Sequence, residues 1–181
     1  MARVRGIHII AILEYLKKKG VNNQVLSALG EQKYKIDHGL NPYEWYSIEE
    51  IETPLLEAAD KIIGKGNEQF FIDMGWYDAE YNAKWYLKLF FKFISPSGMI
   101  KKLPTLWSIY FDTGGINIIS LDKNSAMCRL IDIHTISLLD LKIKGWILYA
   151  LEKAGAKNVR CDITKGSENN KEYTELGMEW E

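Results

Sequence analysis

The chain has 181 residues, of which 47% are hydrophobic and 26% are charged. That length suits one domain of ordinary size, and the hydrophobic share is sufficient for a sizeable core. The 23 Lys and Arg residues nearly balance the 24 Asp and Glu residues, so no overall positive charge exists to attract nucleic acid or anionic lipid. We therefore expect no nucleic-acid partner.

The cysteines and the N-terminus indicate a cytoplasmic protein. Cys128 and Cys161 are isolated residues in predicted strands of a chain without a secretion signal, which is typical of buried, reduced thiols. The apolar run 7–13 follows Arg3 and Arg5, but it is too short to span a membrane and no small-residue cleavage site follows it. We expect no membrane insertion.

The N-terminal part of the chain is predicted to be helical, because apolar residues recur there at helical spacing. The predicted helices are 7–19, 24–29, a helix that a capping-box pattern opens at Ser47 and that runs to about residue 63, and a short helix from Asn67 through Met74. Pro54 lies inside the third pattern and is expected to delay or kink that helix.

The segment 79–94 is the most aromatic stretch, and Asp78 is predicted to cap it as a helix. Its aromatic side chains nearly encircle the helix. This indicates a central core helix, or one that also faces a partner or ligand. A further helix, 100–111, is predicted with its apolar face inward, namely Leu103, Leu106, Trp107 and Tyr110.

The last third of the chain predicts the order β-β-α-β-β. Gly115–Leu121 and 126–135 form one predicted hairpin, and the alternating residues of 159–164 and 174–180 form a second. Both hairpins are local, so the simplest arrangement is a four-stranded antiparallel sheet with the helix 137–154 packed on it.

The expected fold class is therefore α+β, with one domain over residues 1–181. A helical part, 1–112, precedes the β-β-α-β-β part, 113–181. In the predicted helix 137–154, Lys142 lies off the apolar face. Gly145 costs about 1 kcal/mol relative to alanine in a helix interior. We expect it either to pack closely against the sheet or to make room for a ligand.

The sequence lacks the common catalytic and metal-binding motifs, including phosphate loops, G-x-S-x-G, H-E-x-x-H and C-x-x-C. Of the three histidines, His8 is expected in the core or at its boundary, and His38 in a solvated loop. His134 lies at the end of a predicted strand, just before the helix 137–154, where a structural role competes with ligand contact, proton exchange or haem ligation. Without such motifs we expect no metal site. We also expect no enzymatic activity, because nothing in the sequence pairs a nucleophile with a base.

The order of elements resembles a known superfamily. Three features of the sequence support this resemblance: the helix with Gly145 that ends at Gly155, Cys161 in the next strand, and the closing segment 173–180. Together they resemble the ligand-binding domains shared by NO signalling and Golgi transport. That superfamily includes haem-NO-binding domains, the 4-vinyl reductase small-ligand domain and TRAPP-complex subunits.

The N-terminal two thirds are most similar to an uncharacterised bacterial family first noticed in myxobacteria, through the patterns around 43–45, Gly75 and 103–110. The superfamily resemblance implies a sensor or adaptor domain, often dimeric, with a pocket between helices and sheet. Its haem branch requires a Tyr-x-Ser-x-Arg motif, which this sequence lacks, and only Cys161 matches the cysteines of the 4-vinyl reductase branch. We therefore expect neither haem nor another cofactor.

These observations predict a non-enzymatic small-molecule-binding or sensory domain with an apolar or aromatic pocket for a small apolar ligand. The predicted ligand-binding residues are Trp85, Phe90, Trp107, Tyr110, His134 and Trp146. The alternative is a protein-interaction module, a homodimer or adaptor without a ligand, that uses exposed aromatic surface. An enzyme site assembled from dispersed residues is the remaining alternative.

Overall fold

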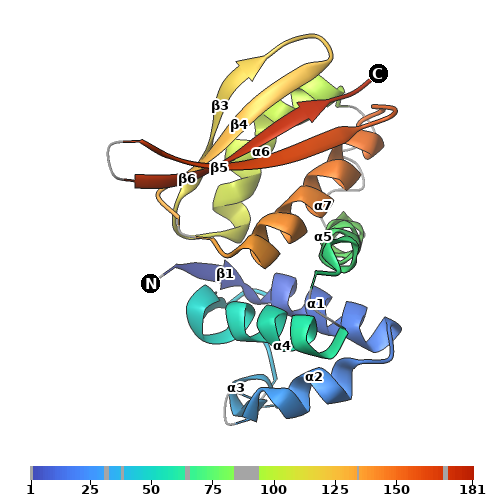
Figure 1. Cartoon of the computed structure of the whole chain (residues 1–181), viewed down its shortest axis with the longest axis vertical. Coiled ribbons are helices and arrows are strands. Elements are labelled where there is room, and N and C mark those ends of the chain that lie inside the picture. The colour runs from blue at the N-terminus through green and yellow to red at the C-terminus, as the bar shows by residue number, and fades with distance from the viewer. Residues whose placement is uncertain are drawn as a thin grey trace.

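The computed structural model describes residues 2–30, 33–37, 39–63, 66–83, 94–133, 135–168 and 171–181 (Figure 1). The N-terminal elements are β1 (Arg3–Arg5), α1 (Gly6–Lys18), α2 (Asn22–Ala28), α3 (Lys33–Asp37), β2 (Trp45–Ser47), the π-helical turn η2 (Ile48–Glu52), α4 (Thr53–Ile63) and α5 (Glu68–Asn82). They are followed by α6 (Pro96–Tyr110), β3 (Gly115–Leu121), β4 (Ser125–Ile131), α7 (Ser137–Lys153), β5 (Arg160–Glu168) and β6 (Lys171–Glu179). The predicted α+β class is confirmed.

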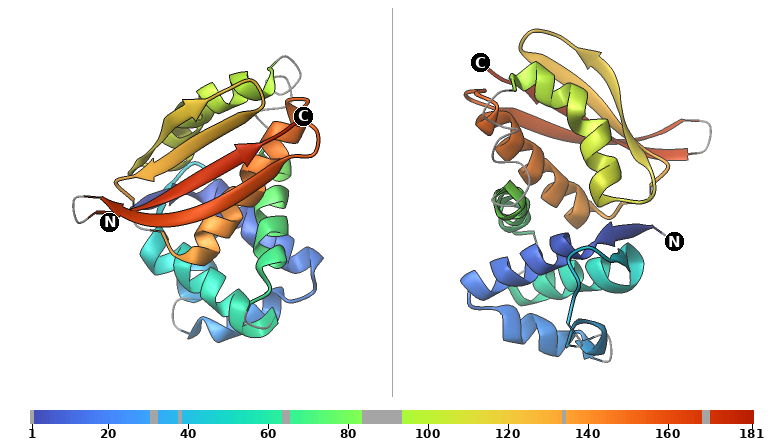
Figure 2. Two further views of the ribbon diagram at one scale, coloured as in Figure 1. Left: turned by 45° about the horizontal axis from the view of Figure 1, so that its top comes forward. Right: turned by 180° about the vertical axis from the view of Figure 1, so that it is seen from behind.

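The main sheet is antiparallel throughout, with strand order β3-β4-β6-β5. Both predicted hairpins are present, and Cys128 of β4 and Ile163 of β5 each pair with Leu176 of β6. One face of the sheet is covered by α6 and α7 together (Figure 2). The predicted sheet and its helix α7 are therefore confirmed, and α6 lies beside α7 on the same face.

The two cysteines are free and buried, as expected. Burial raises the pKa of Cys128 to about 11 and that of Cys161 to about 12, so both are protonated thiols at neutral pH. Within the part of the chain that the structure describes, no helix is long and apolar enough to cross a membrane.

The helix start near Ser47 follows the predicted capping pattern, since the Ser47 hydroxyl accepts a hydrogen bond from the Glu50 amide (3.1 Å). The turn η2 then precedes α4, so Pro54 lies in the first turn of α4, where its missing N–H is tolerated. The expected delay is confirmed. Glu52, the last residue of η2, is fully buried.

The structure corrects the prediction for Asp78. Asn67 does cap a helix, by accepting from the Phe70 amide (3.3 Å), but that helix runs on to Asn82 as α5. Asp78 therefore lies inside α5 with its side chain buried, and it does not cap a second helix. Of the predicted aromatic helix, residues 84–93 lie outside the described residues.

Helices α5 and α7 cross with their backbones in contact, and two glycines make this possible. A Cβ on Gly145 would lie 1.9 Å from the Ile72 carbonyl oxygen, and a Cβ on Gly75 would lie 1.8 Å from the Lys142 carbonyl oxygen. Gly145 is thus closely packed, as expected, but its partner is α5 and the expected contact with the sheet is wrong.

We predict that Gly145→Ala destabilises the fold by several kcal/mol. The gain of about 1 kcal/mol in helix propensity is outweighed, because the methyl group forces the two backbones apart. Urea unfolding followed by circular dichroism measures the change. Gly177→Ala in β6, where no atom lies within 4 Å of the added Cβ, is the control and should change stability little. Equal stability of the Gly145→Ala variant and the parent chain would contradict the crossing.

Candidate functional site

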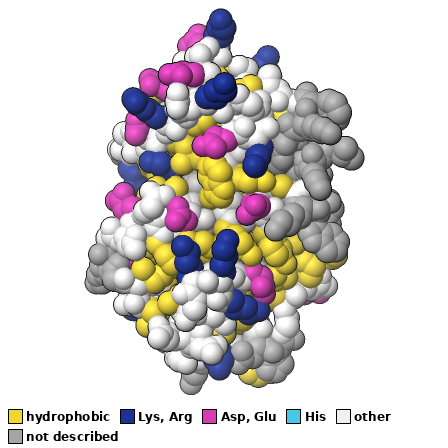
Figure 3. Space-filling model, turned by 90° about the vertical axis from the view of Figure 1, so that its right-hand side faces the viewer, with side chains coloured by type: hydrophobic (Ala, Val, Ile, Leu, Met, Phe, Trp, Pro, Cys, Tyr) yellow, Lys and Arg dark blue, Asp and Glu magenta, His cyan; other side chains and the backbone are white. Residues whose placement is uncertain are grey.

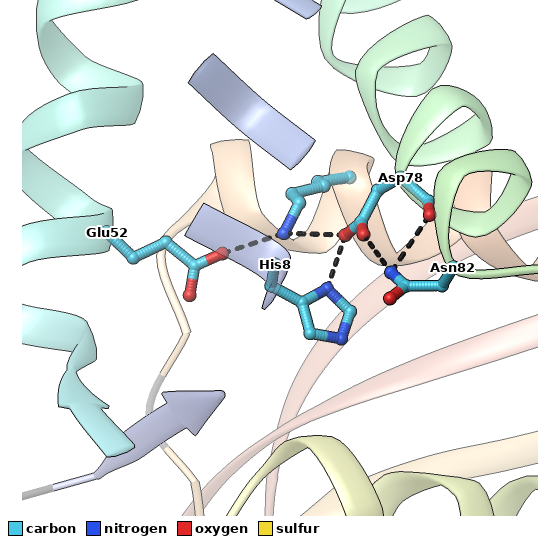
Figure 4. Close-up of polar contacts among 5 residues, drawn as sticks. His8, Glu52, Asp78 and Asn82 are labelled. Carbon is cyan, nitrogen blue, oxygen red and sulfur yellow. Dashed lines mark hydrogen bonds and ion pairs between the residues drawn. The ribbon is translucent and has the colours of Figure 1, made fainter. Parts of the chain in front are cut away.

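A cluster of buried charges lies beside the crossing of α5 and α7 (Figure 4). Lys142 of α7 is only 3% exposed, and its Nζ lies 2.8 Å from Glu52 Oε1 and 3.0 Å from Asp78 Oδ2. His8 of α1 contacts the same Asp78 oxygen through Nδ1. Asn82 donates from its side-chain amide to Asp78 Oδ1 (2.6 Å). The cluster thereby joins α1, η2, α5 and α7.

The partners in this cluster keep each other charged. Burial alone raises the pKa of Asp78, but the charges of His8 and Lys142 and hydrogen bonds from both lower it below its ordinary value. Burial alone lowers the pKa of Lys142, but the charges of Asp78 and Glu52 raise it above its ordinary value. At neutral pH Asp78 is therefore a carboxylate and Lys142 an ammonium.

Asp78 also determines the orientation of the His8 ring. Because Nδ1 faces a carboxylate oxygen, we assign the proton to Nδ1, which donates to Asp78. The other ring nitrogen, Nε2, points away from the carboxylates toward the side where α6 lies (Figure 4). Nε2 is buried and has no hydrogen-bond partner among the described residues.

A small cavity of about 50 Å³ adjoins this ring, and residues of α1, α5, α6, α7 and the start of β3 line it. Its wall is mainly apolar and aromatic, and its lining residues are His8, Asp78, Leu103, Leu106, Trp107, Tyr110, Phe111, Ile116, Leu139, Lys142, Ile143, Trp146 and Ile147. The Tyr110 ring lies against both His8 (centroids 4.5 Å apart) and Trp146 (6.3 Å). The cavity thus has a polar end at His8 and an apolar body.

Three of the predicted ligand-binding residues, Trp107, Tyr110 and Trp146, line this cavity. Trp107 is fixed there, because its Nε1 donates to the Thr113 carbonyl (3.0 Å) and its ring stacks on Phe111 (4.1 Å). The Trp146 Nε1, by contrast, is buried with no hydrogen-bond partner within the described ranges. The other three predicted residues, Trp85, Phe90 and His134, lie outside the described residues.

The sequence did not reveal the polar end of the cavity. The sequence predicts His8 in the core or at its boundary and Lys142 away from the apolar face. The available signal was weak: Asp78 and Lys142 each fall within one helical turn of a mid-helix glycine, Gly75 and Gly145 respectively. Residues at that spacing share a helix face.

Comparisons with known proteins show the fold. No protein-family model matches the sequence, and no curated protein does. Among solved structures, the Fe(II) unliganded H-NOX protein from K. algicida is similar with a TM-score of 0.76 at 12% identity, covering 98% of this chain and 96% of that chain. A mutant of the T. tengcongensis H-NOX has a TM-score of 0.71 at 11% identity, with 98% and 97% covered.

A third similar structure is an oxygen-binding H-NOX domain related to soluble guanylate cyclases, with a TM-score of 0.72 at 10% identity and 98% and 95% covered. At such identities the likeness establishes the fold, which is H-NOX-like over nearly the whole chain. The haem-NO-binding part of the expected resemblance therefore holds at the level of fold. The likeness to 4-vinyl reductase domains, TRAPP subunits and the myxobacterial family remains a prediction.

The cavity does not fit haem. A volume of about 50 Å³ holds roughly four water-sized atoms, whereas a porphyrin has tens of atoms. The cationic side chain at the cavity, Lys142, is already engaged by two carboxylates and is not available to a propionate. The sequence also lacks the Tyr-x-Ser-x-Arg motif.

We predict that Lys142→Met destabilises the fold by about 3–5 kcal/mol at pH 7, because it leaves Glu52 and Asp78 as buried, unneutralised carboxylates. In the parent chain the lowered pKa of Asp78 contributes stability above its ordinary pKa, and that stability is lost as the pH falls through the lowered value. In Lys142→Met the two buried carboxylates lack their cation, so protonating them as the pH falls relieves the cost of burying them. The loss of unfolding free energy relative to the parent chain should therefore shrink between pH 7 and pH 4.

Chemical denaturation across this pH range measures the deficit. Lys144→Met, two residues along α7 and only partly buried, is the matched control and should show a small, pH-independent effect. A deficit for Lys142→Met that stays constant with pH would contradict the buried charge cluster.

Proposed function

We propose that this chain is a non-enzymatic sensory domain that binds a small molecule in the cavity between α1, α5, α6 and α7. The observation that carries the proposal is a mainly apolar cavity whose lining includes two residues, His8 and Trp146, with buried nitrogens that have no partner among the described residues. Buried polar atoms are normally hydrogen-bonded, so two of them at one cavity favour an occupant. The H-NOX-like fold supports a sensory role by analogy.

The size of the cavity supports a small ligand. Room for roughly four water-sized atoms excludes a macrocycle and favours a compact molecule with an apolar body. The side chains that line the cavity include no serine, threonine or cysteine among the described residues, so the pair of Asp78 and His8 has none of these nucleophiles to activate, and the Lys142 amine is engaged by two carboxylates. This supports binding over catalysis.

The position of the cavity supports signal transmission. Its walls come from the N-terminal helix α1 as well as from α6 and α7 on the sheet. The same two parts are also joined by the pairing of β1 with the end of α6, through the Val4–Phe111 bridge and the Arg3–Asp112 ion pair (2.5 Å). A ligand in the cavity would therefore bias how these parts pack against each other.

We predict that xenon, which occupies cavities of this kind, raises the melting temperature of the chain by binding only the folded state. Ile143→Phe, which fills the cavity from α7, should abolish the shift. Ile109→Phe on α6 is the matched control, because Ile109 is half exposed and does not line the cavity. Thermal unfolding under xenon pressure makes the measurement. A shift that persists in Ile143→Phe, or none in the parent chain, would overturn the proposal.

A second candidate function, self-association, is favoured by a surface groove of about 340 Å³ between α1 and α5. Figure 3 shows apolar side chains gathered on the face that carries α5, with basic and acidic side chains around them. The groove has an aromatic floor and carries two lysines and two carboxylates; its lining is Tyr15, Lys18, Lys19, Asp73, Trp76, Tyr77 and Glu80. Equal opposite charges on one patch suit a second copy of the chain, because a two-fold axis can bring each sign against the other.

We predict that, if this groove mediates a homodimer, the double variant Lys18→Glu/Lys19→Glu weakens self-association about tenfold through like-charge repulsion. Sedimentation velocity over a range of concentrations measures the dimer constant. Lys101→Glu/Lys102→Glu places the same charge change on exposed residues of α6, outside the groove, and should leave the constant unchanged. A monomer at every concentration, or equal effects of the two double variants, would contradict this second candidate.

A further inference from the structure

Two residues that line the cavity, His8 and Trp146, each carry a buried nitrogen, and the two nitrogens differ in hydrogen-bonding chemistry. The Trp146 indole nitrogen can only donate a hydrogen bond. His8 already donates from Nδ1 to Asp78, so in the neutral ring Nε2 can only accept. Both nitrogens are buried and lack a partner among the residues that the structure describes. One donor and one acceptor therefore remain to be satisfied at the same cavity.

The two nitrogens belong to residues that line the same cavity. Both side chains line the cavity, His8 from α1 and Trp146 from α7, and the Tyr110 ring lies against each of them. A buried polar group without a partner costs on the order of 1–3 kcal/mol. An occupant that satisfies both atoms at once removes both costs, so this pair selects among molecules that the apolar wall alone would accept equally.

The charge beside the cavity narrows the ligand class further. Asp78 lines the cavity as a carboxylate, and Lys142 is already engaged by Asp78 and Glu52, so a carboxylate or phosphate entering beside Asp78 would meet a like charge. An ammonium group would leave the Trp146 donor facing another donor. A hydroxyl group, in contrast, donates and accepts from a single oxygen.

We propose that the cavity binds a small neutral alcohol of about four non-hydrogen atoms, whose hydroxyl donates to His8 Nε2 and accepts from Trp146 Nε1. The alkyl body would pack against the aliphatic wall formed by Leu106, Ile143 and Ile147. This inference rests on the proposed function, since it names the ligand class of the same cavity. His8 and Trp146 are the residues that determine the specificity for the hydroxyl group.

The test uses three probes on the whole ¹⁵N-labelled chain: 2-propanol, acetone and xenon. 2-Propanol and acetone have nearly the same size, but acetone cannot donate to His8. Each is titrated while the Trp146 indole N–H and the His8 ring nitrogens are followed by NMR. We expect a saturable shift of both residues with 2-propanol and about tenfold weaker binding of acetone, the effect of one lost hydrogen bond.

Trp146→Phe removes the donor and keeps an aromatic ring in the wall. It should weaken 2-propanol binding about tenfold and leave xenon binding in place, which also shows that the variant is folded. Trp76→Phe makes the same substitution on α5, outside the cavity, and should change neither.

The outcomes separate this inference from the proposed function. Equal binding of 2-propanol and acetone, or unchanged 2-propanol binding in Trp146→Phe, overturns the inference that the ligand is an alcohol. Xenon binding in the same experiments would still support the cavity as a ligand site. If none of the three probes binds, both the inference and the proposed function fail.

Discussion

The contact between the backbones of α5 and α7 is the constraint on which the candidate site depends. Gly75 and Gly145 allow each helix to approach a carbonyl of the other more closely than any side chain would permit. Asp78 lies three residues after Gly75 and Lys142 lies three residues before Gly145, so the crossing brings their side chains together. The ion pair at 3.0 Å and the position of His8 against Asp78 both follow from that approach.

The buried charges are better understood as a device for specificity than as a source of stability. Replacing a buried ion pair by well-packed apolar residues is often neutral or stabilising, whereas removing one partner is costly. Here the cluster fixes four elements in one relative arrangement, because Lys142 must meet Glu52 of η2 and Asp78 of α5 together. That arrangement turns His8 Nε2 away from the carboxylates, toward the side where α6 lies (Figure 4).

Most of the fold could be predicted from the sequence, because its signals are local. Alternating residues predicted both hairpins, and helical spacing placed Trp107, Tyr110 and Trp146 on inward faces, where they line the cavity. Periodicity does not show which element packs against a helix face. The predicted packing of Gly145 against the sheet is therefore wrong, and Gly145 packs against α5. The local pattern predicts Asp78 as a helix cap and Lys142 as a residue off the apolar face, because charged side chains normally lie in water and only the tertiary crossing buries this pair.

The long sequence separations inside the charge cluster have a consequence for how the chain reaches its structure. His8 pairs with Asp78 across 70 residues, and Glu52 pairs with Lys142 across 90. Contacts this distant require large loops to close before they contribute, which slows folding. During synthesis from the N-terminus, α1, η2 and α5 emerge with two carboxylates and no lysine to neutralise them at their centre. The ion pairs of this cluster are therefore completed only after α7 has left the ribosome.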